Sequence, residues 1–479
     1  MKWLAGGVVI LACAFFDWHS GGTGKWFPVC LLAGLLLVRR EWSLTRAHEA
    51  GLLLFLWAGS SILWSEDWRQ GLHQWGLSLA LLVVFLRAGE LEKLLPWLVT
   101  GAVAAVLATL AFVEHAGFGN PAFLVEFLLI AAPFLALTGR YGIAVAVLAV
   151  SWLLVFNRQD IVLMAIPVLA LAGAPEGWRR YVFWALVLAG LCAVVLIEPL
   201  QVSALYRLEL AVNSLTLWLQ APWFGHGFGS FNAVYPAVQE SVLILNLMDS
   251  PAMVAGAAHN EPVQLLVELG LIGFLVALYL VWQVLPPWKT PLHRACAWSL
   301  VMAGALSLVQ FPLQNPATAL LVALSLGVLA GANEVTYRVR LRPVVLVVPA
   351  VSVAVFGLTV WIGASLYGQG ERFAEKGWWS AALHMHSRAA TWSNDYRIRL
   401  QLPMTLDGLL QAYPQEIPDS AADAIHAHTL KKHPGVRLAR LRYLKLTGRS
   451  PDEQQQIVAD LKREQPFAAR FILPRILGD

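Results

Sequence analysis

The sequence contains few charged residues. Asp, Glu, Lys and Arg make up 13% of its 479 residues, whereas 58% are hydrophobic, and the mean hydropathy is +0.63. Soluble domains average about 25% charged residues. This shortage of charge excludes a large soluble protein and predicts a polytopic integral membrane protein. The 21 tryptophans fit belts of aromatic side chains at the two membrane surfaces.

The sequence also lacks the patterns that mark several other kinds of site. The four cysteines lie singly inside apolar runs, which argues against a disulfide framework or a zinc site. There is no His-Glu-x-x-His motif and no second ligand pair at helical spacing, so we predict neither a metal nor a cofactor. A net charge of +4, without a basic run interleaved with aromatics, excludes nucleic acid as a partner.

The apolar residues fall into about thirteen runs, several a little shorter than the roughly 20 residues that a helix needs to cross a bilayer. The runs lie near residues 3–17, 24–38, 49–64, 70–88, 94–113, 120–138, 141–157, 159–174, 181–199, 260–285, 294–313, 316–333 and 343–366. The predicted fold is therefore all-α, a membrane bundle of about 12–13 transmembrane helices.

The loops between these runs differ in charge. Alternate loops, together with the N-terminus, carry fourteen basic residues, whereas the opposite loops up to residue 366 carry only Lys25, Arg69, Arg158 and Arg207. Basic residues accumulate on the cytoplasmic side of membrane proteins. The bias therefore predicts that the long loop at 200–258 and the C-terminal tail lie outside the cytoplasm.

The tail has a different composition from the rest of the chain. Residues 367–479 are polar and show the spacing of short amphipathic helices at 378–390 and 420–432, with a helical hairpin at 437–463. We therefore predict a transmembrane domain at 1–366 and a soluble helical domain at 367–479. Paired helices suggest a module like tetratricopeptide repeats, although a plain helical cap without a binding role fits equally well.

Three arginines are predicted to lie outside the cytoplasm near the membrane: Arg69, Arg158 and Arg207. Planar guanidinium groups bind diphosphates well, so these residues are candidates for holding an anionic head group. The simpler interpretation pairs Arg158 with Asp160 and Arg207 with Glu209. Both interpretations are open from the sequence alone.

A glycine-rich stretch lies within the outer loop, after an amphipathic segment at 203–220 that is suited to the membrane surface. It runs from Pro222 to Phe231 with alternate glycines at Gly225, Gly227 and Gly229. Such glycines permit sharp turns or a close approach of backbone to a ligand. The stretch has no Gly-Lys-Ser/Thr, which argues against a nucleotide site.

Polar residues continue into the next apolar run. Asn260, Gln264 and Glu268 are spaced four residues apart, which places them on one face of a helix, and His259 stands at its mouth. Histidine titrates near neutral pH, so His259 is a candidate general base. The alternative is a helix-capping histidine above hydrogen bonds between helices. Glu261 is a further candidate beside His259.

Four segments together resemble the superfamily of O-antigen ligases, Wzy-type polysaccharide polymerases and bacterial O-oligosaccharyltransferases. They are Ser61 to Arg69, Phe156 to Asp160, Pro222 to Phe231 and His259 to Gly273. The last resembles a His-Asn-x-x-Leu-Gln-x-x-x-Glu-x-Gly-x-x-Gly signature. The resemblance extends over roughly residues 50–335.

The resemblance implies a metal-independent, inverting glycosyltransferase of the bacterial inner membrane with its active face in the periplasm. The donor would be a glycan on undecaprenyl diphosphate. Arg158 and Arg207 would hold the diphosphate, and His259 would activate the acceptor hydroxyl. The acceptor could be lipid A core, another glycan or a protein, and residues 307–321 resemble a segment of the branch that modifies pilin-like proteins.

Other classes of protein predict different features. A transporter or flippase for lipid-linked sugars should show repeats with broken helices in both halves of the chain, and no matching pair is evident. A membrane scaffold predicts no polar constellation at all. A serine protease would have only Ser230 and His259 as a candidate pair.

Overall fold

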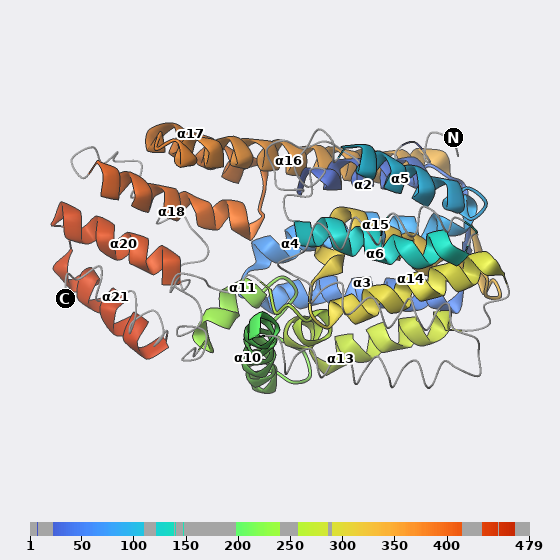
Figure 1. Cartoon of the computed structure of the whole chain (residues 1–479), viewed down its shortest axis with the longest axis horizontal. Coiled ribbons are helices and arrows are strands. Elements are labelled where there is room, and N and C mark those ends of the chain that lie inside the picture. The colour runs from blue at the N-terminus through green and yellow to red at the C-terminus, as the bar shows by residue number, and fades with distance from the viewer. Residues whose placement is uncertain are drawn as a thin grey trace.

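The computed structural model describes residues 23–109, 121–137, 198–239, 257–285, 290–413, 434–448 and 450–464, together with Gly7, Gly139 and Val147. Within these residues the chain is almost entirely helical, which confirms the predicted all-α fold (Figure 1). Short 3-10 turns lie at Thr23–Lys25, Ile62–Trp64, Ala88–Leu91, Tyr235–Ala237 and Pro312–Gln314.

Nine helices of the described residues form an elongated bundle, and each coincides with a predicted apolar run. They are α2 (Trp26–Leu37), α3 (Arg46–Ser61), α4 (Trp68–Arg87), α5 (Leu95–Thr109), α6 (Pro121–Leu137), α13 (Glu261–Val284), α14 (Pro291–Ser307), α15 (Pro316–Gly331) and α16 (Pro343–Glu375). The runs predicted at 3–17, 141–157, 159–174 and 181–199 lie outside the described residues, apart from Gly7, Val147 and residues 198–199.

Local sequence signals explain where these helices begin. Thr45 caps α3: its hydroxyl accepts from the His48 N–H, and its own N–H donates to Nδ1 of His48 at 3.1 Å. Pro291, Pro316 and Pro343 are the first residues of α14, α15 and α16. Proline suits this position because its ring fixes a helical φ and its missing N–H would have no partner there.

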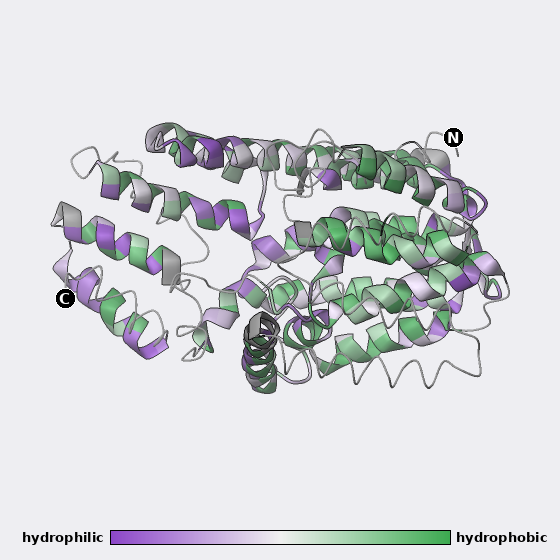
Figure 2. Ribbon diagram, viewed as in Figure 1, coloured by the Kyte–Doolittle hydropathy of each residue, from purple (hydrophilic) through white to green (hydrophobic). Residues whose placement is uncertain are grey.

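Three helices of the described chain are long and apolar enough to cross a membrane, at Trp68–Leu91, Glu261–Val284 and Val345–Glu375. Figure 2 shows the bundle coloured as predominantly hydrophobic. Large apolar side chains on the outside of α13, such as Leu275, Leu278 and Trp282, are exposed. A lipid environment accounts for this exposure, because water would penalise a continuous apolar surface.

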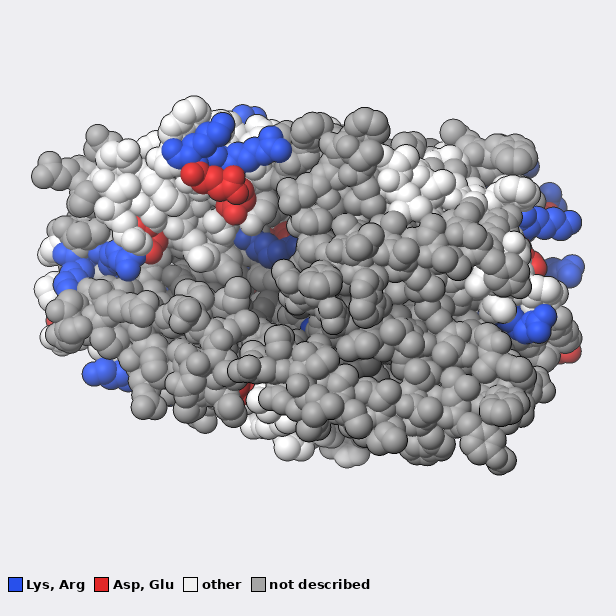
Figure 3. All heavy atoms as spheres, viewed as in Figure 1, with Lys and Arg blue, Asp and Glu red and all other residues white. Residues whose placement is uncertain are grey.

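One end of the bundle is basic, and a small antiparallel sheet lies there. Strand β1 (Glu41–Leu44) pairs with β2 (Tyr337–Arg340), with Glu41 opposite Arg340. The sheet joins the loop before α3 to the loop before α16. Figure 3 shows Lys and Arg at this end, on the right, and over the C-terminal helices on the left. That the basic end faces the cytoplasm stays a prediction.

The glycine-rich segment follows α10 (Glu198–Gln220), which lies across the long axis of the bundle in Figure 1. One face of α10 is buried through Leu210 and Leu217 against the short helix α11 (Phe231–Val234) and its neighbours. The opposite face is an exposed apolar stripe formed by Leu205, Leu208, Val212, Leu215 and Leu219. A crosswise helix with such a stripe fits a position along the membrane surface.

The tail begins as a continuation of the bundle. Helix α16 passes unbroken through the predicted boundary at 366–367, and α17 (Trp379–Trp392) folds back along it. Then follow α18 (Tyr396–Ala412), α20 (Pro434–Thr447) and α21 (Pro451–Glu464). The last two agree with the predicted hairpin around Gly448. The helix predicted at 420–432 lies outside the described residues.

Helices α2 and α16 approach closely at Gly34, where an added Cβ would lie 2.8 Å from the Ala350 carbonyl oxygen. We predict that Gly34→Leu destabilises the protein by about 1–3 kcal/mol, because a helix backbone has to move. The measurement is thermal unfolding of the purified protein in detergent. Gly304→Leu is the matched control, since nothing lies within 4 Å of that position. Equal melting temperatures for the two variants would contradict the packing.

Candidate functional site

Helix α13 is broken in its first half. Gly270 has φ 67° and ψ −173°, a backbone conformation that only glycine adopts readily, and the segments on either side are helical. A break of this kind exposes carbonyl groups of the first segment and N–H groups of the second. Unsatisfied groups of this sort cost several kcal/mol each within a membrane, so they require partners.

The glycine-rich loop supplies those partners through its own backbone. On the first segment, the N–H groups of His226 and Gly227 donate to the Val267 and Glu268 carbonyls at 2.8 and 2.9 Å. On the second, the N–H groups of Leu271 and Ile272 donate to the Pro222 and Trp223 carbonyls at 2.8 and 3.3 Å. We call this set of four hydrogen bonds the backbone splice. It caps both halves of α13 at once.

The three glycines make this close approach possible. Each has a positive φ. An added Cβ would lie 2.5 Å from the Glu268 carbonyl at Gly225, 2.5 Å from the Ser65 Cα at Gly227, and 2.7 Å from the Gly71 nitrogen at Gly229. The glycines therefore bring the loop against protein backbone in α13 and at the start of α4. Their predicted part in donor and acceptor binding stays a prediction.

Glu268 joins the helix to the loop through its side chain. The carboxylate is almost fully buried; Oε2 accepts from the Gly229 N–H at 3.0 Å, and Oε1 accepts from Nε2 of Gln264 at 3.1 Å. Two members of the predicted polar stripe are thus hydrogen-bonded to each other. Asn260, the third, is the N-cap of α13, where its Oδ1 accepts from the Val263 N–H.

Polar groups at the start of α13 also hold the segment after α14. We call residues 307–314 the wall segment. Nδ2 of Asn260 donates to the Leu308 carbonyl at 3.1 Å. The carboxylate of Glu261 accepts from the Ser307 hydroxyl at 2.8 Å and from the Leu313 N–H at 2.7 Å. Three hydrogen bonds therefore fix the wall segment beside His259.

His259 lies between aromatic rings with a strained backbone. Its φ is 49°, a left-handed value that side chains other than glycine rarely adopt. The imidazole makes an edge contact with Phe311 of the wall segment, with ring centroids 4.8 Å apart. A second edge contact, to Tyr206 of α10, spans 6.1 Å. The surrounding elements thus fix the position of the ring.

Arg207 belongs to the same site. Its Nε donates to the Val309 carbonyl of the wall segment at 2.9 Å, and its neighbour Tyr206 contacts His259. The structure therefore brings the predicted arginine and the predicted histidine to one place. Arg69 lies over the ring of Trp68, with 5.5 Å between Cζ and the ring centroid. Arg158 lies outside the described residues.

The wall segment was not predicted as part of the site. The sequence drew attention to residues 307–321 only through their resemblance to an acceptor-related segment. The usable signal was the proline at position 312 together with polar Ser307 and Gln314 inside an apolar region. Proline interrupts a helix, and polar groups near hydrocarbon require partners.

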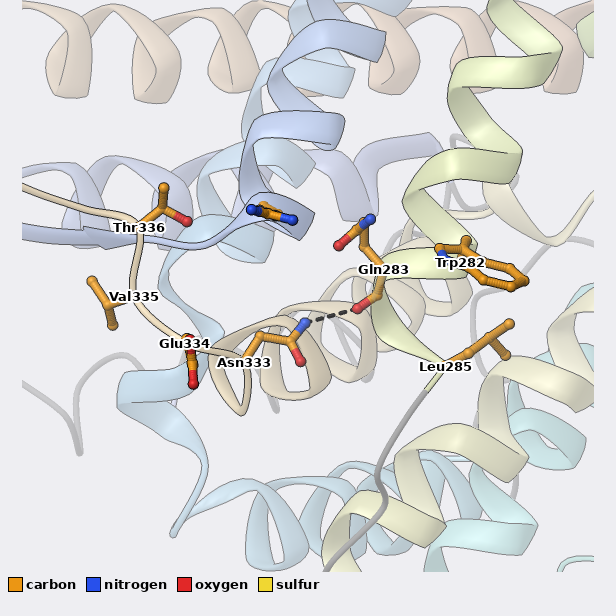
Figure 4. A pocket seen from close by; sticks show the side chains of 8 residues that line it. Trp282, Gln283, Leu285, Asn333, Glu334, Val335 and Thr336 are labelled. Atoms are coloured by element: carbon orange, nitrogen blue, oxygen red, sulfur yellow. Dashed lines mark hydrogen bonds between the residues drawn. The ribbon is translucent and has the colours of Figure 1, made fainter.

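A hollow with a mixed polar and apolar lining is found at the other end of the bundle. It measures about 670 Å³ and is lined by Trp282 and Gln283 of α13 and by the stretch from Asn333 to Thr336 before β2 (Figure 4). Nδ2 of Asn333 donates to the Gln283 carbonyl across it at 2.7 Å. Because these residues lie at the basic end, this hollow is separate from the His259 site.

Metal ligands do not gather among the described residues: within these ranges no three side chains of His, Cys, Asp or Glu form a group suited to a metal ion. The groups around His259 are instead an arginine, amides, a hydroxyl and two carboxylates engaged as hydrogen-bond acceptors. Such a site can bind an anion at the arginine and exchange a proton at the imidazole.

Part of the chain that contains this site is similar to a known protein family. Residues 125–278 match a family model described as O-antigen ligase, about a third of the chain. The match includes α10, the glycine-rich loop and the broken part of α13, and it confirms the resemblance to the O-antigen ligase superfamily over this segment. It supports a membrane enzyme like the O-antigen ligases and polymerases. Neither a curated protein nor a solved structure matches the chain.

The break in α13 leads to a test of the backbone splice. At Gly270 an added Cβ would lie 2.3 Å from the Trp223 carbonyl oxygen. We expect Gly270→Ala to cost more than the roughly 1–3 kcal/mol of backbone strain alone, because the loop is displaced as well. Thermal unfolding in detergent measures the loss. Gly377→Ala serves as control, since Gly377 has φ +74° but open space around it. A smaller effect at Gly270 than at Gly377 would refute the splice.

Proposed function

We propose that the protein transfers a glycan from undecaprenyl diphosphate to a hydroxyl acceptor on the periplasmic face of a bacterial inner membrane. The observation that carries this proposal is the meeting of Arg207 and His259 at one wall segment. An anion-binding group and a group that can accept a proton are the two that such a transfer requires. The O-antigen ligase family match supports the same chemistry.

The proposed reaction is a single displacement. The acceptor hydroxyl attacks the anomeric carbon, the bond from that carbon to the diphosphate oxygen breaks, and the diphosphate leaves with the electron pair. Arg207, together with Arg158, neutralises the leaving charge, and His259 takes the hydroxyl proton and later returns it to water. Attack opposite the leaving group inverts the anomeric centre. Because diphosphate is a good leaving group, positioning and charge stabilisation suffice without a metal.

The backbone of His259 supports a functional rather than a capping role. A capping residue needs no left-handed backbone, and Asn260 already supplies the side-chain cap of α13. Residues held in unfavourable backbone conformations cluster at active sites, where surrounding structure maintains them. The contacts with Phe311 and Tyr206 provide that support.

The surroundings of the site suit a lipid-borne donor. The exposed apolar stripe of α10 places the membrane surface close to Tyr206 and Arg207, which lie on the same helix. A polyprenyl diphosphate has its charged group at this level and its chain in hydrocarbon. The donor would therefore reach Arg207 without leaving the bilayer.

A transporter for lipid-linked sugars is the second candidate, because broken membrane helices are common in transporters. In transporters the free helix ends at the break bind the substrate. Here the backbone splice occupies those ends, since His226 and Gly227 bind the carbonyl groups and Pro222 and Trp223 accept from the N–H groups. The break in α13 thus serves loop attachment, which favours the transferase.

His259 is the first residue to test. We expect His259→Ala to lower the rate of glycan transfer by about 10²–10⁴-fold, the usual contribution of a general base, while donor binding is retained. Purified protein is incubated with undecaprenyl-diphosphate glycan and, separately, lipid A core, a second lipid-linked repeat and a pilin-like protein. The acceptor that gains sugar defines the subclass.

The control for this experiment is His384→Ala, which removes an exposed histidine from α17. It should transfer glycan at the normal rate. Added EDTA should leave transfer unchanged if the reaction needs no metal. Full activity of His259→Ala with every acceptor would refute the assignment of the base.

The role of Arg207 is tested by measuring how the rate of transfer depends on donor concentration. Replacing it with Ala should lower transfer by about 10²-fold, because removing one group that stabilises developing charge has this effect. Arg207→Lys should retain part of the activity, since the charge stays but the planar fork is lost. Initial rates against donor concentration measure both variants, with Arg388→Ala in α17 as an exposed control. An unchanged dependence on donor concentration in Arg207→Ala would contradict diphosphate binding.

A further inference from the structure

The start of α18 lies against the loop between α3 and α4. Nη2 of Arg399 is 2.5 Å from Oδ2 of Asp67, and the two side chains are only 6% and 1% exposed. Beside this ion pair, the Tyr396 N–H donates to Oε1 of Gln70 at 2.8 Å. The C-terminal tail is thus attached to the outer end of the bundle by charged and polar contacts.

The attaching end of α18 is itself well ordered by local bonds. Asp395 is the N-cap and accepts from the Arg397 N–H at 2.9 Å, while its carboxylate pairs with the Arg397 guanidinium at 2.8 Å. Burial raises the pKa of the Asp395 carboxyl, but the charge and hydrogen bonds of Arg397 outweigh it and hold the pKa below its usual range. Nε of Arg399 donates to the Asn394 carbonyl. The ion pair with Asp67 therefore projects from a fixed helix end.

The residues that α18 holds are adjacent to those that bind the glycine-rich loop. The Ser61 hydroxyl accepts from the Phe228 N–H at 3.0 Å, and the Ser65 hydroxyl donates to the Phe228 carbonyl at 3.2 Å. Gly71, in the first turn of α4, packs against Gly229. The segment from Ser61 to Gly71 thus contacts α18 on one side and the loop on the other.

A second contact reaches the same region directly. Ala233 of α11, four residues after Gly229, packs against the apolar core of the tail, which contains Leu406, Leu410 and Tyr443. The C-terminal helices therefore contact two segments that adjoin the glycine-rich loop. One is the start of α4, and the other is α11, which follows the loop in sequence. A detached binding module would need neither contact.

We propose that the C-terminal helices position the active site, with Asp67 and Arg399 as positioning residues. The ion pair fixes the segment from Ser61 to Gly71, this segment fixes the glycine-rich loop, and the loop fixes the half of α13 that begins next to His259. The role in catalysis rests on the proposed glycan transfer. The role in ordering the loop does not.

The test uses the full-length protein and two single substitutions, Asp67→Asn and Arg399→Gln, with their combination. Asparagine keeps the side-chain oxygen that caps α4 at Gln70 but removes the charge. Each single variant removes this ion pair but keeps one of its two buried charges, whereas the double variant removes both charges. Arg442→Ala is the matched control, because it breaks an ion pair with Asp407 within the tail rather than one between the tail and the bundle.

Two measurements separate positioning from stability. Hydrogen exchange of peptides covering 222–231 reports the order of the loop, and glycan transfer reports kcat and KM. We expect both single variants to exchange faster in this loop and to lose about tenfold or more in kcat, since small misplacements of reacting groups cost up to about 10²-fold. The double variant should lose less than the product of the single losses, because contacting residues are not additive.

The results decide between the alternatives as follows. Normal loop exchange and normal kcat in Asp67→Asn and Arg399→Gln would overturn the proposal, as would an equal effect of Arg442→Ala. If a single variant does not fold, Arg399→Lys replaces it and is judged by the same two measurements. If the wild-type protein transfers no glycan but the loop still loosens only in the Asp67 and Arg399 variants, the positioning stands and the proposed function falls.

Discussion

The site depends on the backbone splice between the glycine-rich loop and the break in α13. A break within an apolar helix leaves backbone donors and acceptors without partners, and hydrocarbon offers them none. Four backbone hydrogen bonds from one loop satisfy both ends of the break. The loop therefore cannot move independently of the helix that begins next to His259, and any group that holds the loop also holds the site.

The helices of the bundle were predictable because their signals are local. Long apolar runs, prolines at first helical positions and the capping Thr45 mark each element within a few residues of sequence. The spacing of Gln264 and Glu268 also predicted correctly that they share a face. Spacing along one helix does not reveal what that face contacts, however. The partner of Glu268 is Gly229, 39 residues earlier in the chain.

The contacts between distant segments were not predictable for the same reason. The segment from Ser61 to Arg69 drew attention through its family resemblance, but Arg399, the ion-pair partner of Asp67, lies 332 residues away in a tail with no distinctive motif. The three alternate glycines predicted sharp turns or a close approach of backbone to a ligand. In the structure they lie close to protein backbone, and their part in ligand binding stays a prediction. A pattern of glycines predicts that other atoms approach the backbone closely. It does not predict whether those atoms belong to a ligand or to another part of the protein.

The nature of the Asp67–Arg399 contact bears on its purpose. A buried ion pair contributes little net stability, because the cost of removing two charges from water offsets their attraction, and apolar replacements are often as stable. Removing one partner alone is costly, since the other charge is left buried. This balance fits the proposed role, in which the pair fixes one alignment of the tail on the bundle rather than strengthening the attachment. An apolar contact such as that of Ala233 can supply attachment, whereas an ion pair with fixed hydrogen-bond geometry is suited to the proposed positioning of the loop beside His259.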